Sequence, residues 1–250
     1  MMFPLLIFNL SGVYDNFNPQ KGVKIDLRDV EGTSCYCCDA AKDEIPARIS
    51  NIKKQFPGPS VNLIDSGDYH YMTALLCGQI REEFSLVLFD HHPDMQAPAF
   101  GNILSCGGWM RWMLKENSYL GKVLIIGISP KLLGETGGFP GRTAVITENI
   151  GRAEILSTIK AWKPQGKLYI SIDKDVLSQE YALTNWDQGS MTLDTLCMAI
   201  KECLALEHDG LIGVDICGEI PPSKGGGDYG GSINAVADKR IADLIQRLNA

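Results

Sequence analysis

One segment of this sequence alternates ligand-type side chains with other residues. Within residues 90–94, Asp90, His92 and Asp94 stand two positions apart, and Pro93 precedes the last of them. In an extended backbone, residues two apart project to the same side, roughly 7 Å from one to the next. Proline cannot donate a hydrogen bond to a sheet, so regular strand pairing is expected to stop here. The segment therefore predicts a strand end that presents three metal ligands in one direction.

A second segment repeats this spacing with carboxylates alone. Asp173 and Asp175 stand two apart within residues 171–175. With Asp90 and Asp94 they would place four carboxylates at strand ends, and such groups repel one another strongly when they are ionised and unpaired. Two divalent cations would cancel that charge, so charge balance by itself predicts a metal site. The structural alternative is a set of strand-end turns capped by Asp side chains.

The histidines favour the metal interpretation. The chain has four, and three of them, His70, His91 and His92, fall in these strand-end segments. His70 follows residues 65–69 and is expected at the start of the next helix. His91 should point away from His92 and is not predicted as a ligand. A ligand set of carboxylate oxygens with some imidazole suits manganese, with zinc and iron as alternatives.

Short apolar runs supply the strands that must position these residues. The runs are continuous rather than alternating and are rich in Leu, Ile and Val, which is typical of strands buried on both faces. Strands are predicted at Pro4–Leu10, Val61–Asp65, Ser85–Asp90, Val123–Ile128, Lys167–Asp173 and Leu211–Ile216, with a weaker one at Thr143–Ile146.

Helical segments lie between these runs, with apolar positions at spacings of three and four. They are predicted at Asp43–Gln55, Tyr71–Glu83, Trp109–Asn117, Arg152–Ala161, Leu193–Leu206 and Asn234–Leu248, the fifth capped by Thr192. The alternation predicts an α/β fold with three α/β/α layers around a mostly parallel central sheet, in a single domain spanning residues 1–250. In such sheets ligands gather at the carboxyl ends of the strands, where the metal-type segments fall.

Composition limits the classes of protein to which the chain can belong. Its 250 residues with 45% hydrophobic content fit one globular domain, and a net charge of -7 argues against nucleic acid as a partner. The apolar run at 4–10 is too short to span a membrane and is interpreted as a strand, not a signal peptide. The eight cysteines lack zinc-finger spacing, so we expect reduced thiols in a cytoplasmic protein. A thiol role for the cluster Cys35–Cys38 stays open.

Taken in order, the segments 66–70, 90–94 and 171–175 resemble the arginase/agmatinase (ureohydrolase) family, which also includes formiminoglutamases. That family carries Gly-Gly-Asp-His, Asp-x-His-x-Asp and Ser-x-Asp-x-Asp at the ends of parallel strands. Here the first segment reads Ser-Gly-Asp-Tyr-His, with Tyr69 inserted before His70. The likeness runs from about residue 60 to about residue 220. It implies an arginase-like fold and two divalent cations, normally Mn²⁺.

The resemblance also implies a set of metal ligands. One cation would be held by His70, Asp90, Asp94 and Asp173. The other would be held by His92, Asp90, Asp173 and Asp175. Asp90 and Asp173 would then bridge the two ions.

The implied reaction is hydrolysis of a C–N bond in a guanidino, amidino or amide small molecule, by attack of a metal-bridging hydroxide. Asp94 would orient the hydroxide and pass its proton to the leaving amine. Asp94 and Glu219 are the predicted catalytic residues. Asp187 and Asp215 are the predicted substrate contacts. Glu219 stands one residue later than the glutamate with which the family holds a guanidinium.

Two alternatives remain at this stage. Arginases carry a proton-shuttling histidine after the second segment, and residues 101–108 contain none. This favours a non-catalytic, metal-binding regulatory protein of the same fold. A deacetylase-like amidohydrolase with one zinc is the other alternative, suggested by the adjacent His91 and His92. We expect a small-molecule substrate and no membrane partner, and homo-oligomer formation is left open.

Overall fold

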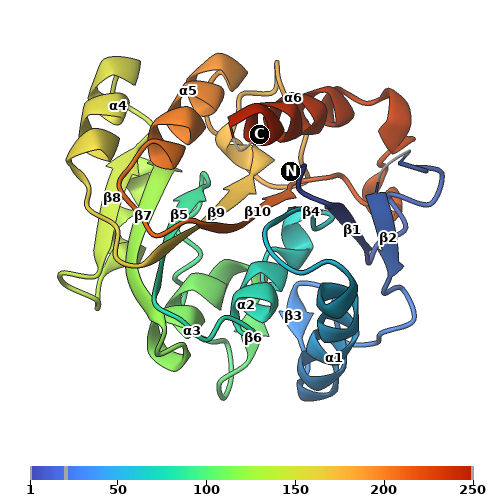
Figure 1. The fold of residues 1–250 in the computed structure, drawn as a ribbon. Helices are drawn as coiled ribbons and strands as arrows, with labels where there is room; N and C mark the ends of the chain where they lie inside the picture. The colour runs from blue at the N-terminus through green and yellow to red at the C-terminus, as the bar shows by residue number, and fades with distance from the viewer. Residues whose placement is uncertain (1, 20–21, 249–250) are drawn as a thin grey trace.

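The computed structural model describes residues 2–19 and 22–248, and its centre is a sheet of eight parallel strands (Figure 1). The strands run in the order β2-β1-β4-β10-β9-β5-β7-β8, and every pairing between neighbours is parallel. Their bounds are β1 Leu5–Asn9, β2 Gly22–Asp26, β4 Ser60–Leu63, β5 Phe84–Phe89, β7 Leu120–Ile128, β8 Thr143–Thr147, β9 Lys167–Asp173 and β10 Leu211–Cys217.

Within the described residues, six α-helices cover the two faces of this sheet. Figure 1 shows α1, α2 and α3 on one face and α4, α5 and α6 on the other. They span Asp39–Gln55, Met72–Cys77, Trp109–Glu116, Arg152–Ala161, Leu193–Leu204 and Ile233–Leu248. Each face has its own buried apolar cluster, because alternate strand residues point to opposite sides. The predicted three-layer α/β/α architecture is confirmed.

Local sequence explains where the helices begin and end. Thr192 caps α5, as predicted, because its hydroxyl accepts a hydrogen bond from the Thr195 amide at 3.2 Å. The first helix begins at Asp39, four residues before the predicted start, with the Cys38 sulfur accepting from the Ala41 amide. The second helix is much shorter than predicted and ends at Cys77, where Gly78 closes the last turn through its own amide.

Three strands were missed from the sequence. β2 lies at the sheet edge and is partly exposed, so it lacks the continuous apolar run of the central strands. β3 (Tyr36–Cys37) and β6 (Leu104–Ser105) form a separate antiparallel ribbon. Each has two residues, too few to give a periodic signal. This ribbon brings segments distant in sequence beside the strand ends that carry the metal-type residues.

Within the part of the chain that the structure describes, no helix has the length and apolar character needed to cross a membrane. All eight cysteines are free thiols.

Candidate metal centre

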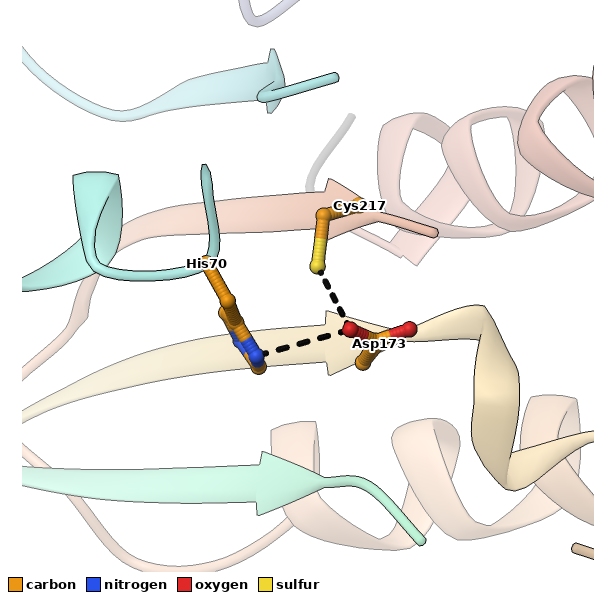
Figure 2. A group of neighbouring side chains, drawn as sticks. All are labelled: His70, Asp173 and Cys217. Atoms are coloured by element: carbon orange, nitrogen blue, oxygen red, sulfur yellow. Dashed lines mark hydrogen bonds and ion pairs between the residues drawn. The ribbon is translucent and has the colours of Figure 1, made fainter. Parts of the chain in front are cut away.

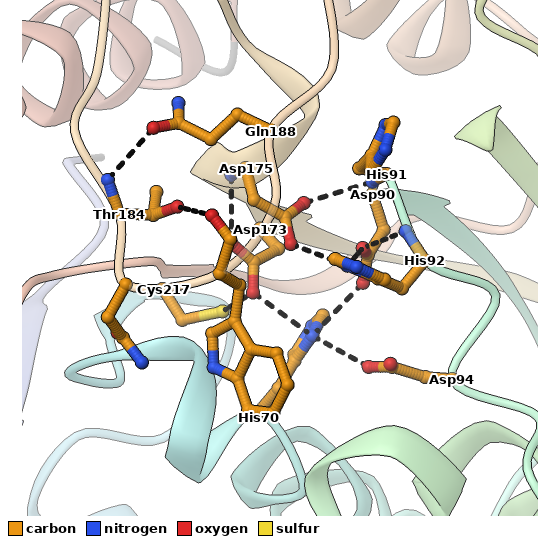
Figure 3. A network of polar contacts seen from close by, with 12 residues as sticks. His70, Asp90, His91, His92, Asp94, Asp173, Asp175, Thr184, Gln188 and Cys217 are labelled. Carbon is orange, nitrogen blue, oxygen red and sulfur yellow. Dashed lines mark hydrogen bonds and ion pairs between the residues drawn. The ribbon is translucent and has the colours of Figure 1, made fainter. Parts of the chain in front are cut away.

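Three strands deliver imidazole and carboxylate groups to the same edge of the sheet. β4 leads through a 3₁₀ turn (Gly67–Tyr69) to His70, β5 leads into Asp90, and β9 ends at Asp173. In the sheet order β4-β10-β9-β5 these carboxyl ends are close neighbours. Figure 3 shows the side chains converging from these elements.

His70 stands at the centre of the first group. Its Nδ1 atom lies 3.2 Å from Asp90 Oδ2, 3.0 Å from Asp94 Oδ2 and 3.6 Å from Asp173 Oδ2. The other ring nitrogen, Nε2, contacts Ser171 Oγ at 3.0 Å, which fixes the orientation of the ring. The inserted Tyr69 is accommodated within the 3₁₀ turn, so His70 still reaches the cluster.

His92 forms the second group from the opposite side of Asp90. Its Nδ1 atom lies 2.8 Å from Asp175 Oδ2 and 3.6 Å from Asp90 Oδ1. Asp90 therefore turns one oxygen toward each histidine. Asp90 Oδ2 is buried and has no hydrogen-bond partner among the described residues. His91 points elsewhere, toward Glu148 at 3.7 Å, as its place in the alternation predicts.

The carboxylates change how this cluster binds protons. Burial lowers the pKa of His92, but hydrogen bonds with Asp175 and Asp90 outweigh this effect and raise the pKa to about 12. Burial and the charge of Asp90 raise the pKa of Asp175 to about 6. Burial likewise raises the pKa of Asp94 and of Asp173. The cluster thus retains protons that a cation would displace.

These donors fit divalent cations. His70, Asp90 and Asp94 offer ligand atoms within 4.8 Å of one another, and so do Asp90, His92 and Asp175. The buried Asp90 oxygen without a partner is an atom that a cation would satisfy. Among the described residues, no lysine or arginine lines the cavity to neutralise the carboxylates instead. The structure brings the six predicted ligands together, and their role in binding metal stays a prediction.

The cluster forms the floor of a cavity of about 300 Å³. Trp186 forms part of the wall, and its indole Nε1 donates to the buried Asp68 at 3.0 Å. A Cβ atom at Gly67 would stand 2.9 Å from Trp186 Cδ1 and 3.0 Å from Asp173 Oδ2. Glycine is therefore required at this position, because the indole and the cluster both approach the backbone closely.

The remaining lining residues come from the segment after β5, from the β3–β6 ribbon and the residues beside it, and from the turn after β7. They are Cys35, Tyr36, Pro93, Gln96, Ser105, Cys106, Gly107, Leu132 and Glu135. Glu135 is the acidic lining residue outside the cluster. The segment that lacks the shuttle histidine contributes Ser105, Cys106 and Gly107.

The side chain of Trp109 holds Asp94 in place. The Trp109 indole is fully buried, and its Nε1 atom donates to Asp94 Oδ2 at 2.5 Å. Asp94 has a φ of 49°, in the left-handed region that residues with a side chain seldom occupy. The sequence signal was weak, because Trp109 also reads as an ordinary apolar position at the start of α3.

The structure does not place Asp215 where a substrate contact needs to be. Its side chain lies on the same face of the sheet as Cys217 but one pleat repeat deeper, and it is fully buried. Asn62 Nδ2 donates to it at 2.6 Å and the Tyr169 hydroxyl at 2.7 Å. It does not line the cavity, so the predicted substrate contact is corrected to a role inside the layer beneath the site.

Glu219 also lies outside the cavity. It projects from the opposite side of the sheet end, where its carboxylate accepts a hydrogen bond from the Lys174 ammonium and another from Asn234 Nδ2 at 3.0 Å. Lys174 also contacts Asp238 Oδ1 at 2.8 Å. The predicted catalytic role is therefore corrected, because a buried lysine, and not a substrate, pairs with Glu219.

Asp187 is exposed and does not line the cavity, although its neighbour Trp186 does. In this loop the indole of Trp186 faces the cavity, and the carboxylate of Asp187 faces solvent. The predicted substrate contact of Asp187 is not supported by this arrangement.

Comparison with known proteins gives a match between residues 15–229 and a family model described as the arginase family. An uncharacterised protein of Thermotoga maritima is 30% identical over 183 residues, which cover 71% of this chain. The match spans 66% of the length of that relative.

Solved structures of low sequence identity share the fold. Formimidoylglutamase from Bacillus subtilis superposes with a TM-score of 0.70 at 16% identity, covering 98% of this chain and 86% of that one. Agmatine ureohydrolase of Thermoplasma volcanium gives 0.68 at 16%, covering 99% and 91%. Proclavaminate amidino hydrolase from Streptomyces clavuligerus gives 0.68 at 15%, covering 99% and 92%.

Proposed function

This chain belongs to the arginase family, and from that premise we propose that it is a hydrolase that uses two divalent cations, with Mn²⁺ as the expected metal, to cleave a C–N bond of a small guanidino, amidino or amide compound. The observation that carries the proposal is the convergence of two imidazoles and four aspartates on the floor of one cavity. When bound, the cations would supply a water of lowered pKa near a polarised substrate carbon.

Asp94 is the side chain best placed to hold that water and carry its proton. It lines the cavity, and the Trp109 indole and His70 fix one of its oxygens. Burial raises the pKa of Asp94, and a carboxylate whose pKa is shifted toward neutral is better suited to accept a proton and release it again. Asp94 is thus proposed as the proton carrier.

Substrate recognition is proposed to differ from that of a guanidinium-binding relative. Glu219 is paired with Lys174 and cannot serve as an anchor in the cavity. Outside the cluster, Glu135 is the acidic lining residue, and Tyr36 and Trp186 are the aromatic ones. These groups would accept a planar, electron-poor group such as an amidine or guanidine.

The test measures metal content and hydrolysis in the same preparations. Purified protein is loaded with Mn²⁺ and assayed for ammonia, urea and amine release from a panel of guanidino, amidino and amide compounds. Asp94→Asn should bind Mn²⁺ more weakly, because Asp94 is also a predicted ligand. At Mn²⁺ concentrations that restore full occupancy it should still lose activity by about 100-fold or more, the range for one proton-transfer group. Asp187→Asn, which alters an exposed carboxylate outside the cavity, should leave activity unchanged. Failure to bind Mn²⁺ at millimolar concentration would refute the proposal.

A non-catalytic, metal-binding role is the second candidate. It is favoured by the cavity wall at residues 105–107, where Ser, Cys and Gly stand and no histidine does. Stoichiometric metal without turnover of any compound in the panel would select this role over hydrolysis.

A further inference from the structure

A buried thiol lies against the first group of predicted ligands. Cys217 is the last residue of β10, is fully buried, and its Sγ atom lies 3.1 Å from Asp173 Oδ2. Figure 2 shows His70, Asp173 and Cys217 turned toward one another from three different segments. Their donor atoms lie within 4.8 Å of one another, as close as in the two groups made of histidine and aspartate alone.

The sheet register explains why the sulfur reaches this position. Cys217 is directly opposite Asp173 in the parallel pairing of β10 with β9, so both side chains project to the same face. The chain then turns at Gly218, where φ is 100° and a Cβ atom would stand 2.7 Å from Asp173 Oδ1. The ends of β9 and β10 therefore lie close together, and the Cys217 sulfur contacts Asp173 of the ligand cluster.

We propose that Cys217 is a thiolate ligand of the cation held by His70 and Asp173, and that this position consequently prefers Zn²⁺ to Mn²⁺. Thiolate sulfur is a soft donor that selects zinc, whereas manganese prefers carboxylate oxygen and water. On binding, the S–H bond breaks, a sulfur–metal bond forms and the proton leaves to solvent. The inference rests on the proposed metal centre, but it does not depend on hydrolysis.

A simpler role for the thiol must be distinguished from this one. The S–H group of Cys217 donates to Asp173 Oδ2, so Cys217 could act only by orienting that carboxylate. Cys217→Ser keeps a hydroxyl donor for Asp173 but offers no soft ligand. Cys217→Ala removes both. Cys106→Ala is the matched control, because Cys106 is also a buried thiol and lines the same cavity.

The experiment uses metal-depleted full-length protein reloaded with Zn²⁺, Co²⁺ or Mn²⁺. Zinc-edge X-ray absorption of the unmodified protein should show a sulfur scatterer at about 2.3 Å, the zinc–thiolate distance. The cobalt-loaded protein should show a sulfur-to-metal charge-transfer band in the near ultraviolet. Both Cys217→Ser and Cys217→Ala should lose this band, and Cys106→Ala should keep it.

Affinity provides a second readout. Zinc binding should weaken at least about 10-fold in both Cys217 variants, since even partners outside the ligand shell contribute that much. Manganese binding should change far less. Rescue of zinc affinity by Cys217→Ser, or zinc bound with oxygen and nitrogen neighbours alone, would overturn the thiolate ligand while leaving the metal centre intact. Unmodified protein that binds none of the three cations would overturn both proposals. The X-ray measurement needs no variant, so it remains decisive if a variant fails to fold.

Discussion

The side chain and backbone of Asp94 are constrained in three ways. It faces His70, accepts from the buried Trp109 indole and occupies a left-handed backbone conformation. Such a conformation in a residue with a side chain costs on the order of 1–3 kcal/mol and persists where its surroundings over-determine it. The chain bends at His91 and His92 instead of staying extended, and Asp94 faces the cluster through its left-handed backbone conformation.

Removal of the indole donor tests the importance of this arrangement. Trp109→Phe should lower the free energy of unfolding by about 1–3 kcal/mol, because a buried carboxylate oxygen loses its partner. Bound manganese should be retained, and kcat should fall about 10-fold as Asp94 is held less firmly. Urea unfolding and steady-state kinetics measure both effects.

Trp112→Phe is the matched control for this substitution. Trp112 belongs to the same helix, and its Nε1 atom is buried with no hydrogen-bond partner in the described chain. Loss of that N–H group should therefore leave kcat unchanged. Equal losses of kcat in the two variants would show that packing, and not the hydrogen bond to Asp94, matters.

The pKa values of the cluster predict how metal binding depends on pH. A cation needs neutral His92, whose pKa in the metal-free protein is raised to about 12, so binding displaces a proton throughout the working pH range. Manganese affinity should fall as pH falls, about 10-fold per pH unit for each proton displaced. Below about pH 6 the slope should steepen, because Asp175 then binds a proton as well. Titration calorimetry from about pH 8 to about pH 5 measures this, and a pH-independent affinity would contradict it.

At the scale of elements, the end of β9 is fixed to α6 by a buried lysine. Lys174 stands between Asp173 and Asp175, and its ammonium group contacts Glu219 and Asp238. Burial lowers the pKa of Lys174, but the two carboxylates outweigh it, so the ammonium group remains charged. After β9 the chain forms a 3₁₀ turn at Lys174–Val176, in which Lys174 points away from the cavity while Asp173 and Asp175 line it. The ion pairs therefore position both aspartates through the backbone.

Loss of this lysine should destabilise the fold. Lys174→Met leaves two buried carboxylates without a cation, and breaking a buried pair in this way costs about 3–5 kcal/mol. Lys239→Met removes an exposed lysine from its pair with Asp243 on α6 and should change stability little. Denaturant unfolding of both variants tests the contrast. A loss no larger for Lys174→Met than for Lys239→Met would show that the buried pairs do not hold β9 to α6.

At the scale of the whole molecule, the proposed cations are expected to stabilise the native state. Their ligands come from segments after β4, β5 and β9, which assemble only in the folded chain. Metal at about 100 times its dissociation constant should add about 2.7 kcal/mol, or roughly 5–10 °C in Tm for a chain of this size. A chelator should reverse the gain. Asp90→Asn, which removes a ligand shared by both groups, should abolish it, and thermal melts that do not respond to manganese would argue against a shared centre.

The sequence by itself determined the central strands and the spacing of the predicted ligands. Strands buried on both faces need continuous apolar runs, which is why β5, β7, β9 and β10 were predicted close to their observed bounds. The spacing of ligand-type residues within 90–94 and 171–175 predicted, from the sequence alone, that these groups lie at strand ends. The partly exposed β2 and the two-residue strands β3 and β6 left no comparable pattern.

Tertiary structure decided which charged residues face the cavity. Asp215 and Glu219 lie four residues apart in sequence, yet one is buried beneath the site and the other pairs with Lys174 on the far side. The position of Asp215 along β10 and the turn at Gly218 determine where the side chains of Asp215 and Glu219 point. Both features depend on which strand lies next to β10. The sequence also gave no reason to join Cys217 to His70 and Asp173, because only the register of β10 on β9 brings the sulfur to the cluster.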